Sequence, residues 1–543
     1  MFTFGFSFLA LRPTASSVPI VLTLTTLLVY GHRQFRSQHA FKDATMLITA
    51  ITFAGVLARA SPSVNALSSV GVSVIVLFIL ALITSTLTIS IVYINTRLGS
   101  HFPGAWSRLT FFPALWATLW FGVSYISPVG RLSAWSPTEG GSFYGWMAPF
   151  FGPVGNDWVV AAWAVVLAQA IGAWYIGEGI PQIATTAPAT FQTSHLSSRN
   201  SSLLLTVILL VLGIPSLLLS NFPLAVVAGP DITPLSMGCV LPPYRRYKHH
   251  TLTLDDYIEE SKKLTSSARF LLWPEGAVTF KSETDLAEGL AQVQDNVTGS
   301  VVGVSFEEDF GDPTSGASGS RRTGIALVSQ APTSPELVYY KRHLVPIAES
   351  FSLSHSQLPP NVTTFHLTAP KDMKKIDWVP DGPPYTRPIS VTASICLDFA
   401  FPSLFAELQS KPALILAPAR TWDIAVGHAM WQQVSQRAEE LGTMILWCDG
   451  GDGGVSGIAG GGFKDFIQVG LGSWVKTVGI SYPFNERRTV NHWGGDLACL
   501  ILVWLSVFGT KFLGRIHFDV FRLDVHKLRN IFRKPPVPEG NLI

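Results

Sequence analysis

Long apolar runs separated by short polar stretches make up roughly the first two fifths of the chain. Two runs near the N-terminus, Phe2–Leu11 and Val18–Tyr30, are shorter than the roughly 20 residues that span a bilayer comfortably. Five further runs are candidate spans by their hydropathy: Ala44–Ala58, Ser68–Ile94, Leu109–Ile126, Trp158–Ile176 and Ser202–Ser220. The pattern predicts a multi-span α-helical membrane domain over residues 1–230, with about seven helices of which the first two are short.

The two short N-terminal runs have an alternative interpretation as a cleaved signal peptide. No basic segment precedes Phe2–Leu11, and no clear small-residue cleavage site follows Val18–Tyr30. We therefore expect retained membrane helices, which could form a thin hairpin.

Polar and apolar residues intermix over residues 231–494, where short apolar runs alternate with amphipathic stretches. Leu254–Leu264 and Val426–Leu441 have helical periodicity, and Gly442 is a stop signal for the second of them. This alternation is typical of a soluble α/β domain of ordinary size.

One more apolar run, Asp496–Leu513, follows that domain. It predicts one C-terminal transmembrane helix at residues 495–514. Residues 515–543 hold several Arg and Lys side chains and predict a basic cytoplasmic tail.

The composition agrees with a membrane protein. Of the 543 residues, 48% are hydrophobic and only 14% are charged, and the mean hydropathy is +0.34. Such a chain is too apolar for a purely soluble protein, so a polytopic membrane protein is the natural class. The formal net charge of +2 gives no reason to expect a nucleic-acid partner.

The cysteines do not have the spacing of a metal site. The chain contains Cys239, Cys396, Cys448 and Cys499, with no C-x-x-C pair and no His at zinc-site spacing. We therefore expect no metal and no cofactor, and the spacing does not support a disulfide framework.

The distribution of Lys and Arg predicts how the chain is oriented. With a cytoplasmic N-terminus, most basic residues of the helical part fall in inner loops: Arg33, Arg36, Lys42, Arg97 and Arg108. The outer loops then hold few: Arg12, Arg59 and Arg131. About seven preceding spans put the α/β domain of this multi-pass membrane protein on the periplasmic or lumenal face.

Glycosylation sequons offer a test of this orientation. Asn296 and Asn361 lie in the predicted outer domain, whereas Asn200 lies in a predicted inner loop. The sequence does not decide whether Asn296 and Asn361 are glycosylated.

The outer loop at residues 127–157 is rich in aromatic side chains, among them Trp135, Trp146, Phe150 and Phe151. It could act as a lid over a lipid substrate, or its rings could belong to an ordinary interfacial belt. The sequence favours neither interpretation.

Reactive side chains stand at or near the ends of three predicted strands of the α/β domain. An apolar run stops at Pro274 and leaves Glu275 at its end, a second strand contains Lys341 with Glu349 beyond it, and a β-branched run ends at Cys396. Alone, each has a common structural explanation: a solvated carboxylate, an edge lysine or a buried inert cysteine. Together they supply a base, a cation and a nucleophile.

In this order and spacing, these residues resemble the Glu-Lys-Cys triad of the nitrilase (carbon-nitrogen hydrolase) superfamily. Trp273-Pro274-Glu275, Lys341-x-His343-Leu344-Val345-Pro346 and Glu349 narrow the resemblance to apolipoprotein N-acyltransferases, the membrane-embedded branch. The resemblance covers essentially the whole chain and implies an α-β-β-α sandwich for the α/β domain.

The resemblance also implies a role for each residue. Glu275 takes the proton of Cys396, and Lys341 with the backbone N–H near Leu397 stabilises the tetrahedral oxyanion. Glu349 orients Lys341 or the incoming amine. His343 is an alternative base for Cys396, but it faces the same side of a strand as the lysine, so we expect a structural role.

Two segments depart from the family pattern. Ala419-Arg420-Thr421-Trp422 stands where the family usually has Asn-Asp before the tryptophan, and Leu397-Asp398 stands where it usually has Tyr-Glu. These positions shape the pocket, so the departures concern the substrate more than the triad.

The function implied is a membrane-bound acyltransferase. It would move a fatty acyl group from a phospholipid, through a thioester on Cys396, to a lipoprotein or another amine acceptor. Two alternatives stay open: a membrane-anchored amidase that uses water as acceptor and acts on a small amide, and a non-enzymatic membrane protein with a degenerate nitrilase-like domain.

Overall fold

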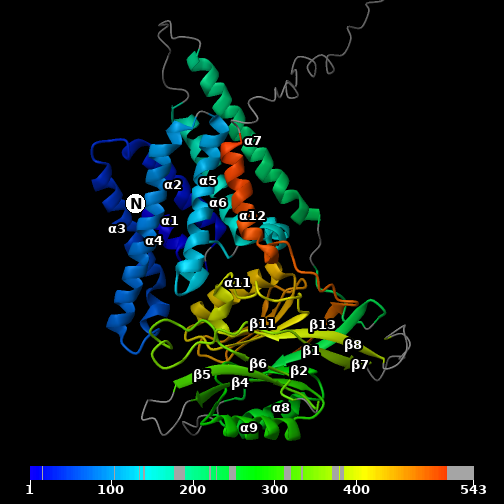
Figure 1. Cartoon of the computed structure of the whole chain (residues 1–543). Helices are drawn as coiled ribbons and strands as arrows, with labels where there is room; N and C mark the ends of the chain where they lie inside the picture. The colour runs from blue at the N-terminus through cyan, green and yellow to red at the C-terminus, as the bar shows by residue number, and fades with distance from the viewer. Residues whose placement is uncertain are drawn as a thin grey trace, which may run out of the picture.

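The computed structural model describes residues 1–14, 16–102, 104–133, 135–138, 141–176, 190–218, 222–227, 229–243, 252–310, 320–331, 334–369, 378 and 385–509. These residues form a helical bundle joined to an α/β domain (Figure 1). The chain passes through the bundle first and the α/β domain second, and then returns to the bundle with helix α12 (Gly495–Phe508).

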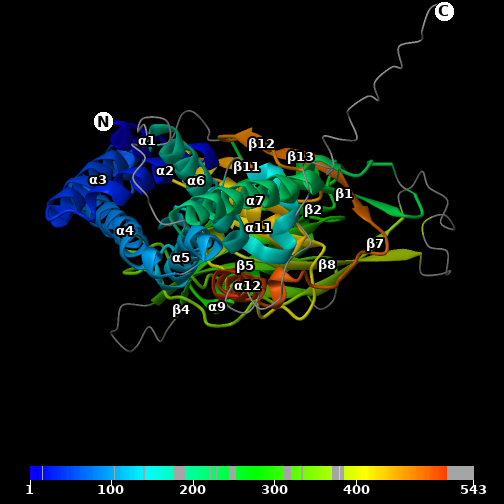
Figure 2. The same cartoon turned by 90° about the horizontal axis from the view of Figure 1, so that it is seen from above.

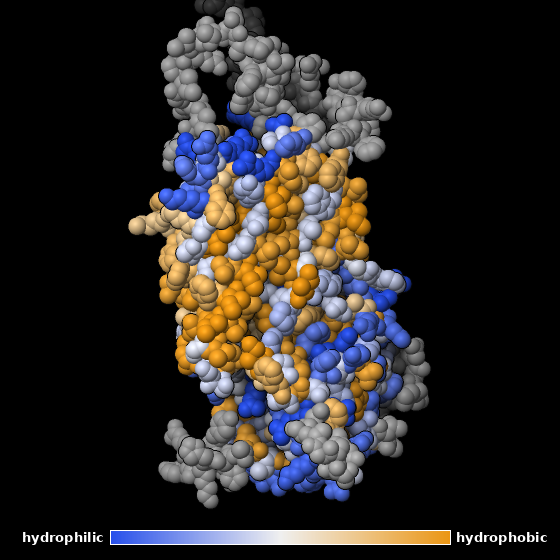
Figure 3. Space-filling model, turned by 60° about the vertical axis from the view of Figure 1, so that its left-hand side comes forward, coloured by the Kyte–Doolittle hydropathy of each residue, from blue (hydrophilic) through white to orange (hydrophobic). Residues whose placement is uncertain are grey.

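The helices of the described part of residues 1–230 are α1 (Phe2–Ala10), α2 (Ser17–Gln34), α3 (Ala40–Val64), α4 (Val70–Leu98), α5 (Ala105–Ile126), α6 (Ala148–Ile176) and α7 (Thr190–Leu218). By length and composition, α3 to α7 each contain a segment that could cross a membrane. On α4, Ile75, Ile79 and Ile83 point outward along one face and are about half exposed. They belong to a broad apolar surface that stands above the polar α/β domain (Figure 3), as expected for helices that face lipid rather than water.

Helix α6 begins earlier than the predicted run at Trp158 because a kink adds a first segment to it. Gly152 has φ 55° and ψ −155°, a backbone conformation that residues with a side chain rarely adopt, and Pro153 follows it. A Cβ on Gly152 would lie 2.4 Å from Asn491 Oδ1 and from Asp496 Oδ1. The kink therefore allows α6 to pack closely against the start of α12.

The α/β domain contains two β-sheets. The first has the strand order β13-β1-β2-β4-β5-β6, with β3 paired to β4: β13 (Trp474–Ser481), β1 (Ile232–Cys239), β2 (Phe270–Leu272), β4 (Val301–Phe310), β5 (Ser320–Val328), β6 (Leu337–Tyr340) and β3 (Val278–Phe280). The second has the order β12-β11-β10-β9-β8-β7: β12 (Phe466–Val469), β11 (Val455–Ala459), β10 (Met444–Asp449), β9 (Leu414–Ala419), β8 (Thr386–Ala393) and β7 (Thr363–Thr368). In both sheets the central strands run parallel and the edges are antiparallel.

Helices cover the outer faces of the two sheets and complete an α-β-β-α arrangement (Figure 1). Helices α8 (Leu254–Leu264) and α9 (Glu283–Asn296) pack on the first sheet, and α11 (Ile424–Leu441) packs on the second. The two sheets share one apolar core that also reaches α11, and β9 contributes five of its six buried residues to that core. Helix α11 lies between the second sheet and the bundle, so it forms the layer through which the two halves meet.

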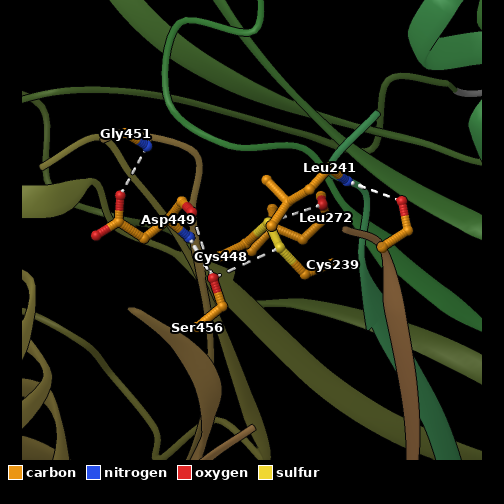
Figure 4. Close-up of a disulfide and its surroundings, with 8 residues drawn as sticks. Cys239, Leu241, Leu272, Cys448, Asp449, Gly451 and Ser456 are labelled. Carbon is orange, nitrogen blue, oxygen red and sulfur yellow. Dashed lines mark hydrogen bonds between the residues drawn. A yellow bond between two sulfur atoms is a disulfide. The ribbon is translucent and has the colours of Figure 1, made fainter. Parts of the chain in front are cut away.

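A disulfide bond crosses this core. Cys239 on β1 is bonded to Cys448 on β10, with the two Cα atoms 5.3 Å apart (Figure 4). The cysteine spacing did not support a disulfide framework, and it therefore did not reveal this bond. The two cysteines are 209 residues apart, so no local spacing indicated the bond, which depends on how the sheets face each other.

The described part of the predicted C-terminal span is the 14-residue apolar helix α12, which is shorter than a bilayer-spanning segment. It packs against α5 and α6, and Trp504 Nε1 donates a hydrogen bond of 2.9 Å to Thr118 Oγ1. Figure 2 shows it beside the bundle, over the α/β domain. The end of the predicted span and the predicted basic tail, residues 510–543, lie outside the described residues.

Candidate active site

Glu275 stands beyond the carboxyl end of β2, where Pro274 ends the strand. Its backbone N–H donates to the carbonyl of Ala419, the last residue of β9, at 3.3 Å. Because β2 and β9 belong to different sheets, this bond fixes Glu275 at the seam of the sandwich. Its side chain is 7% exposed, so the carboxyl group is almost removed from water.

Lys341 directly follows β6 and reaches Glu275 from the edge strand of the first sheet. Its backbone N–H donates to Thr323 O at 3.0 Å, which continues the pairing with β5. The Lys341 Nζ donates to Glu275 Oε1 at 2.6 Å and to the two carboxylate oxygens of Glu349 at 2.9 and 2.8 Å. A buried ammonium thus bridges two carboxylates.

Glu349 belongs to a tight turn that closes over the lysine. Its Oε2 also accepts a hydrogen bond of 2.8 Å from the backbone N–H of Val345. The side chain is 23% exposed, which makes it the more open of the two carboxylates that bind Lys341. It therefore holds Lys341 in place from the solvent side.

Cys396 follows β8 and opens the 3-10 turn η4 (Cys396–Ala400). Its φ of 43° lies in the left-handed region, which is uncommon for a residue with a side chain and is found at strained functional turns. The thiol is hydrogen-bonded to the carboxylate of Glu275. The backbone N–H of Arg420 also donates to the sulfur.

The structure therefore brings Glu275, Lys341 and Cys396 together from three distant parts of the chain. Leu397, the predicted oxyanion residue, is the next residue of the same turn and is buried. The contact between the Arg420 N–H and the Cys396 sulfur was not predicted. In the sequence, Arg420 belongs only to a segment that departs from the family pattern. Its position beside the sulfur depends on the pairing of β8 with β9, which the sequence alone does not reveal.

Burial controls the protonation of the site. It raises the pKa of Glu275 to about 7, against the opposing effect of the Lys341 charge. Burial and the negative charge of Glu275 raise the pKa of the Cys396 thiol well above its usual value. Burial alone would lower the pKa of Lys341, but Glu275, Cys396 and Glu349 outweigh it and raise that pKa. The resting site thus holds a neutral thiol, a permanent ammonium and a carboxylate that can accept the thiol proton.

A second buried carboxylate, Asp398, holds the cysteine turn in place. Its Oδ1 accepts the backbone N–H of His343 at 2.8 Å, and its Oδ2 accepts the Tyr339 hydroxyl at 2.8 Å and the Ile395 N–H at 3.2 Å. These bonds join the turn to the end of β6, the strand that leads to Lys341. From the sequence, the acidic residue after Cys396 was part of the family resemblance, and its departure from the usual Tyr-Glu was expected to shape the pocket; a role in holding the cysteine turn was not predicted.

The ring of His343 serves the same support. Its Nδ1 lies 2.9 Å from Asp398 Oδ1, and the ring stacks on Phe401 with centroids 3.7 Å apart. The histidine is therefore engaged with Asp398, which agrees with a structural role rather than a role as base for Cys396.

A cavity of about 850 Å³ lies next to the triad. Its wall includes Glu275, Glu349 and Arg420, together with the turn at residues 348–354. Across it, Arg321 pairs with Asp309 at 2.9 Å and with Glu307 at 3.4 Å. Cys396 does not line this cavity, but Glu275 and Arg420 both line it and both contact the thiol.

The described residues contain no group of three or more His, Cys, Asp or Glu side chains that could hold a metal ion.

No protein-family model and no curated protein matches this sequence. Among solved structures, the chain is similar to an amidase from Nesterenkonia sp., with 14% identity and a TM-score of 0.31 over 52% of this chain and 98% of that chain. It is similar to Saccharomyces cerevisiae Nit3, a member of branch 10 of the nitrilase superfamily, with 13% identity and a TM-score of 0.33 over 47% and 92%. It is also similar to the C. elegans NitFhit protein, with 11% identity and a TM-score of 0.30 over 55% and 67%. At these TM-scores the likeness assigns no chemistry to the chain.

Proposed function

We propose that the chain is a membrane-bound acyltransferase of the nitrilase type that works through a thioester on Cys396. The observation that carries the proposal is the contact of one buried carboxylate, Glu275, with both the Cys396 thiol and the Lys341 ammonium. A base, a nucleophile and a fixed cation within hydrogen-bond reach are the components that covalent acyl transfer requires.

In the first half-reaction, Glu275 accepts the proton of Cys396 while the sulfur attacks the ester carbonyl of an acyl donor. The carbonyl oxygen becomes an oxyanion, which Lys341 and the backbone N–H groups of Leu397 and Arg420 can stabilise. One such donor typically lowers the barrier by about 3 kcal/mol. The C–O bond of the ester then breaks, the leaving alcohol takes the proton from Glu275, and the acyl group remains on sulfur as a thioester.

In the second half-reaction, an amine attacks the thioester carbonyl and loses its proton to Glu275. The C–S bond breaks, and the thiolate recovers the proton from Glu275. The products are an amide and the free thiol, so the enzyme returns to its starting state without a cofactor. Water in place of the amine would give the carboxylic acid, which is the amidase-like alternative.

The membrane half supports a lipid as the acyl donor. Five helices are long and apolar enough to span a bilayer, and the α/β domain packs directly against the bundle through α11. A phospholipid in the bilayer could thus present its ester to a site next to the membrane without entering water. The proposed donor is a phospholipid, and the proposed acceptor is a lipoprotein or another amine.

The disulfide supports the proposed location of the α/β domain on the periplasmic or lumenal face. Disulfide bonds persist in oxidising compartments and are rare in the cytosol. The Cys239–Cys448 bond lies within the α/β domain, which agrees with the orientation expected from the Lys and Arg distribution.

The decisive experiment traps the intermediate. The full-length protein, purified in detergent, is incubated with a phospholipid that carries an isotope-labelled acyl chain, and the acylated peptide is identified by mass spectrometry. We expect the label on Cys396 and its loss on addition of an amine. Cys499→Ala is the matched control, because Cys499 is the other free cysteine and should not affect labelling.

The outcomes separate the three hypotheses. Label that leaves as the amide supports the transferase, and label that leaves as the free acid despite added amine indicates a hydrolase. A protein that forms no thioester, or a Cys396→Ala variant that still transfers acyl groups, would refute the proposal.

A further inference from the structure

A chain of buried charges connects the helical bundle to the turn that carries Cys396. It begins at Arg131, in the 3-10 segment η2 (Gly130–Ser133) between α5 and α6. The Arg131 Nη1 donates to Glu440 Oε1 at 2.9 Å, and its Nη2 donates to Gln436 Oε1 at 3.2 Å. Both acceptors belong to α11, so a loop of the bundle is bonded to the helix that covers the second sheet.

Glu440 also binds a second arginine, Arg437. Its other oxygen, Oε2, accepts a hydrogen bond of 2.6 Å from Arg437 Nη1. Arg131 is 3% exposed, Arg437 is 4% exposed and Glu440 is fully buried. One buried carboxylate thus neutralises part of the charge of two buried guanidinium groups and fixes the distance between them.

Arg437 ends on the backbone of the cysteine turn. Its Nη2 donates to the carbonyl of Phe401 at 3.3 Å and to that of Phe399 at 3.5 Å. The carbonyl between them, that of Ala400, faces the bundle loop: a Cβ on Gly130 would lie 2.4 Å from Ala400 O. Gly130 has φ 53°, so both its conformation and its surroundings require glycine.

Arg437 of α11 therefore holds the carbonyls on either side of Ala400, and Gly130 of the bundle loop packs against the Ala400 carbonyl itself. Asp398 holds the same turn from the β6 side. Cys396 lies between these two supports in a left-handed conformation that its own preference does not maintain. The hydrogen bond of the thiol with Glu275 and the hydrogen bond that the sulfur accepts from the Arg420 N–H depend on that conformation.

We propose that Arg131 and Arg437, bridged by Glu440, are positioning residues that make the geometry of Cys396 depend on the docking of the helical bundle. They touch neither the sulfur nor the cavity, so they act through the turn. The inference rests on the proposed function in one respect, because it assumes that Cys396 is the reacting group. It adds that the α/β domain has its full reactivity only when the loop at Arg131 is seated on α11.

The test measures the reactivity of the thiol directly. Full-length protein in detergent is treated with iodoacetamide, and the alkylation rates of Cys396 and Cys499 are followed by peptide mass spectrometry. In Arg131→Ala we expect the rate at Cys396 to fall roughly 10- to 100-fold, the usual effect of displacing a reacting group by about 1 Å. Arg131→Lys should recover part of the rate, because a lysine keeps a positive charge next to Glu440. The recovery should be incomplete, because the hydrogen bond to Gln436 is lost.

Two internal controls separate positioning from unfolding. Cys499 is buried between α12 and α5, so its alkylation should stay slow unless the bundle loosens. Arg59→Ala removes another arginine of the bundle, one whose Nε donates to Leu11 O at 2.9 Å, and it should leave Cys396 unchanged.

An Arg131→Ala protein with wild-type alkylation at Cys396 would overturn the inference. The inference would also fail if the alkylation rate of Cys499 rose in Arg131→Ala, because that rise would show that the bundle as a whole has become less tightly packed. Alkylation needs no acyl donor. If the wild-type protein transfers no acyl group but Arg131→Ala still slows alkylation of Cys396, the proposed function fails and this inference stands.

Discussion

The reactivity of the site is decided by where three side chains are buried. Glu275, Lys341 and Cys396 are each at most 7% exposed, so their charges act on one another with little screening by water. The thiol keeps its proton at rest because burial disfavours the charged thiolate and because ionisation would place a second negative charge beside Glu275; both effects raise its pKa. In the proposed mechanism, proton transfer becomes favourable only when a substrate carbonyl receives the negative charge, which would couple activation of the nucleophile to the presence of substrate.

The raised pKa of Glu275, about 7, predicts the pH dependence of acylation. Glu275 can accept the thiol proton only as a carboxylate, so the rate of acylation should rise with pH through about 7. Glu275→Gln should abolish this inflection and lower the rate roughly 10²- to 10⁴-fold, because general base catalysis is lost. The measurement is the pH profile of kcat/KM from burst kinetics. Glu260→Gln, at a surface pair with Lys263, is the control. A profile that is flat around pH 7 would contradict the role of Glu275.

Asp398 gives a prediction on stability. In Asp398→Asn, one carboxylate oxygen becomes an NH2 group that faces other donors, among them the Ile395 N–H or the His343 N–H. Leaving one buried donor without an acceptor costs about 1–3 kcal/mol. We expect a lower Tm for the purified protein and slower alkylation of Cys396. Asp295→Asn, on the exposed side of α9, should change neither. An unchanged Tm in Asp398→Asn would mean that the turn does not depend on this carboxylate.

At the scale of elements, local patterns predicted the elements well and their partners poorly. The helix Leu254–Leu264 is confirmed residue for residue, with Thr253 as its cap, and Gly442 ends α11 with φ 63°. These features depend on periodicity and capping, which act within a few residues. The order of strands, the contact of Arg420 with the sulfur and the Arg131–Glu440 pair depend on residues far apart in sequence, for which one sequence provides no signal.

The disulfide is the clearest case of such a long-range contact and is open to a direct test. Cys239 and Cys448 are bonded, whereas Cys396 and Cys499 are free. Protein denatured without a reductant should therefore bind two maleimide groups, and reduction should raise the number to four. In the Cys239→Ala, Cys448→Ala double variant, the free energy of unfolding should be lower by about 2–4 kcal/mol, because the cross-link no longer restricts the unfolded chain. Four reactive thiols before reduction would exclude the bond.

At the scale of the whole molecule, the bundle and the α/β domain are assembled through one layer. Helix α11 faces the second sheet on one side and the bundle loop at Arg131 on the other, and Trp422, just before α11, donates to Pro62 O of α3 at 2.9 Å. The loop at residues 127–157 was interpreted either as a lid or as an aromatic belt. One part of the loop packs into the bundle, with Trp135 buried against Trp116 and Trp120, and its η2 segment bonds to α11. The loop thus contributes to docking.

In the proposed topology, docking on one face of the bundle places the α/β domain on one side of the membrane, and glycosylation of the sequons tests which side that is. Asn296 and Asn361 lie on the exposed surface of the α/β domain, and Asn200 is exposed near the start of α7. In a eukaryotic expression host, a lumenal α/β domain should carry glycans at Asn296 and Asn361 and none at Asn200. The measurement is the shift in gel mobility on treatment with an endoglycosidase. Asn296→Gln and Asn361→Gln should each remove one step of that shift.

Asn200→Gln is the matched control for orientation and should leave the shift unchanged. A glycan at Asn200 with none at the other two sequons would place the α/β domain in the cytosol. The Cys239–Cys448 bond would then stand in a reducing compartment, where such bonds are rare. The glycosylation test and the thiol count depend on different residues and different chemistry, so they are independent. We expect a lumenal α/β domain to give both results: glycans at Asn296 and Asn361, and two thiols protected by the disulfide bond.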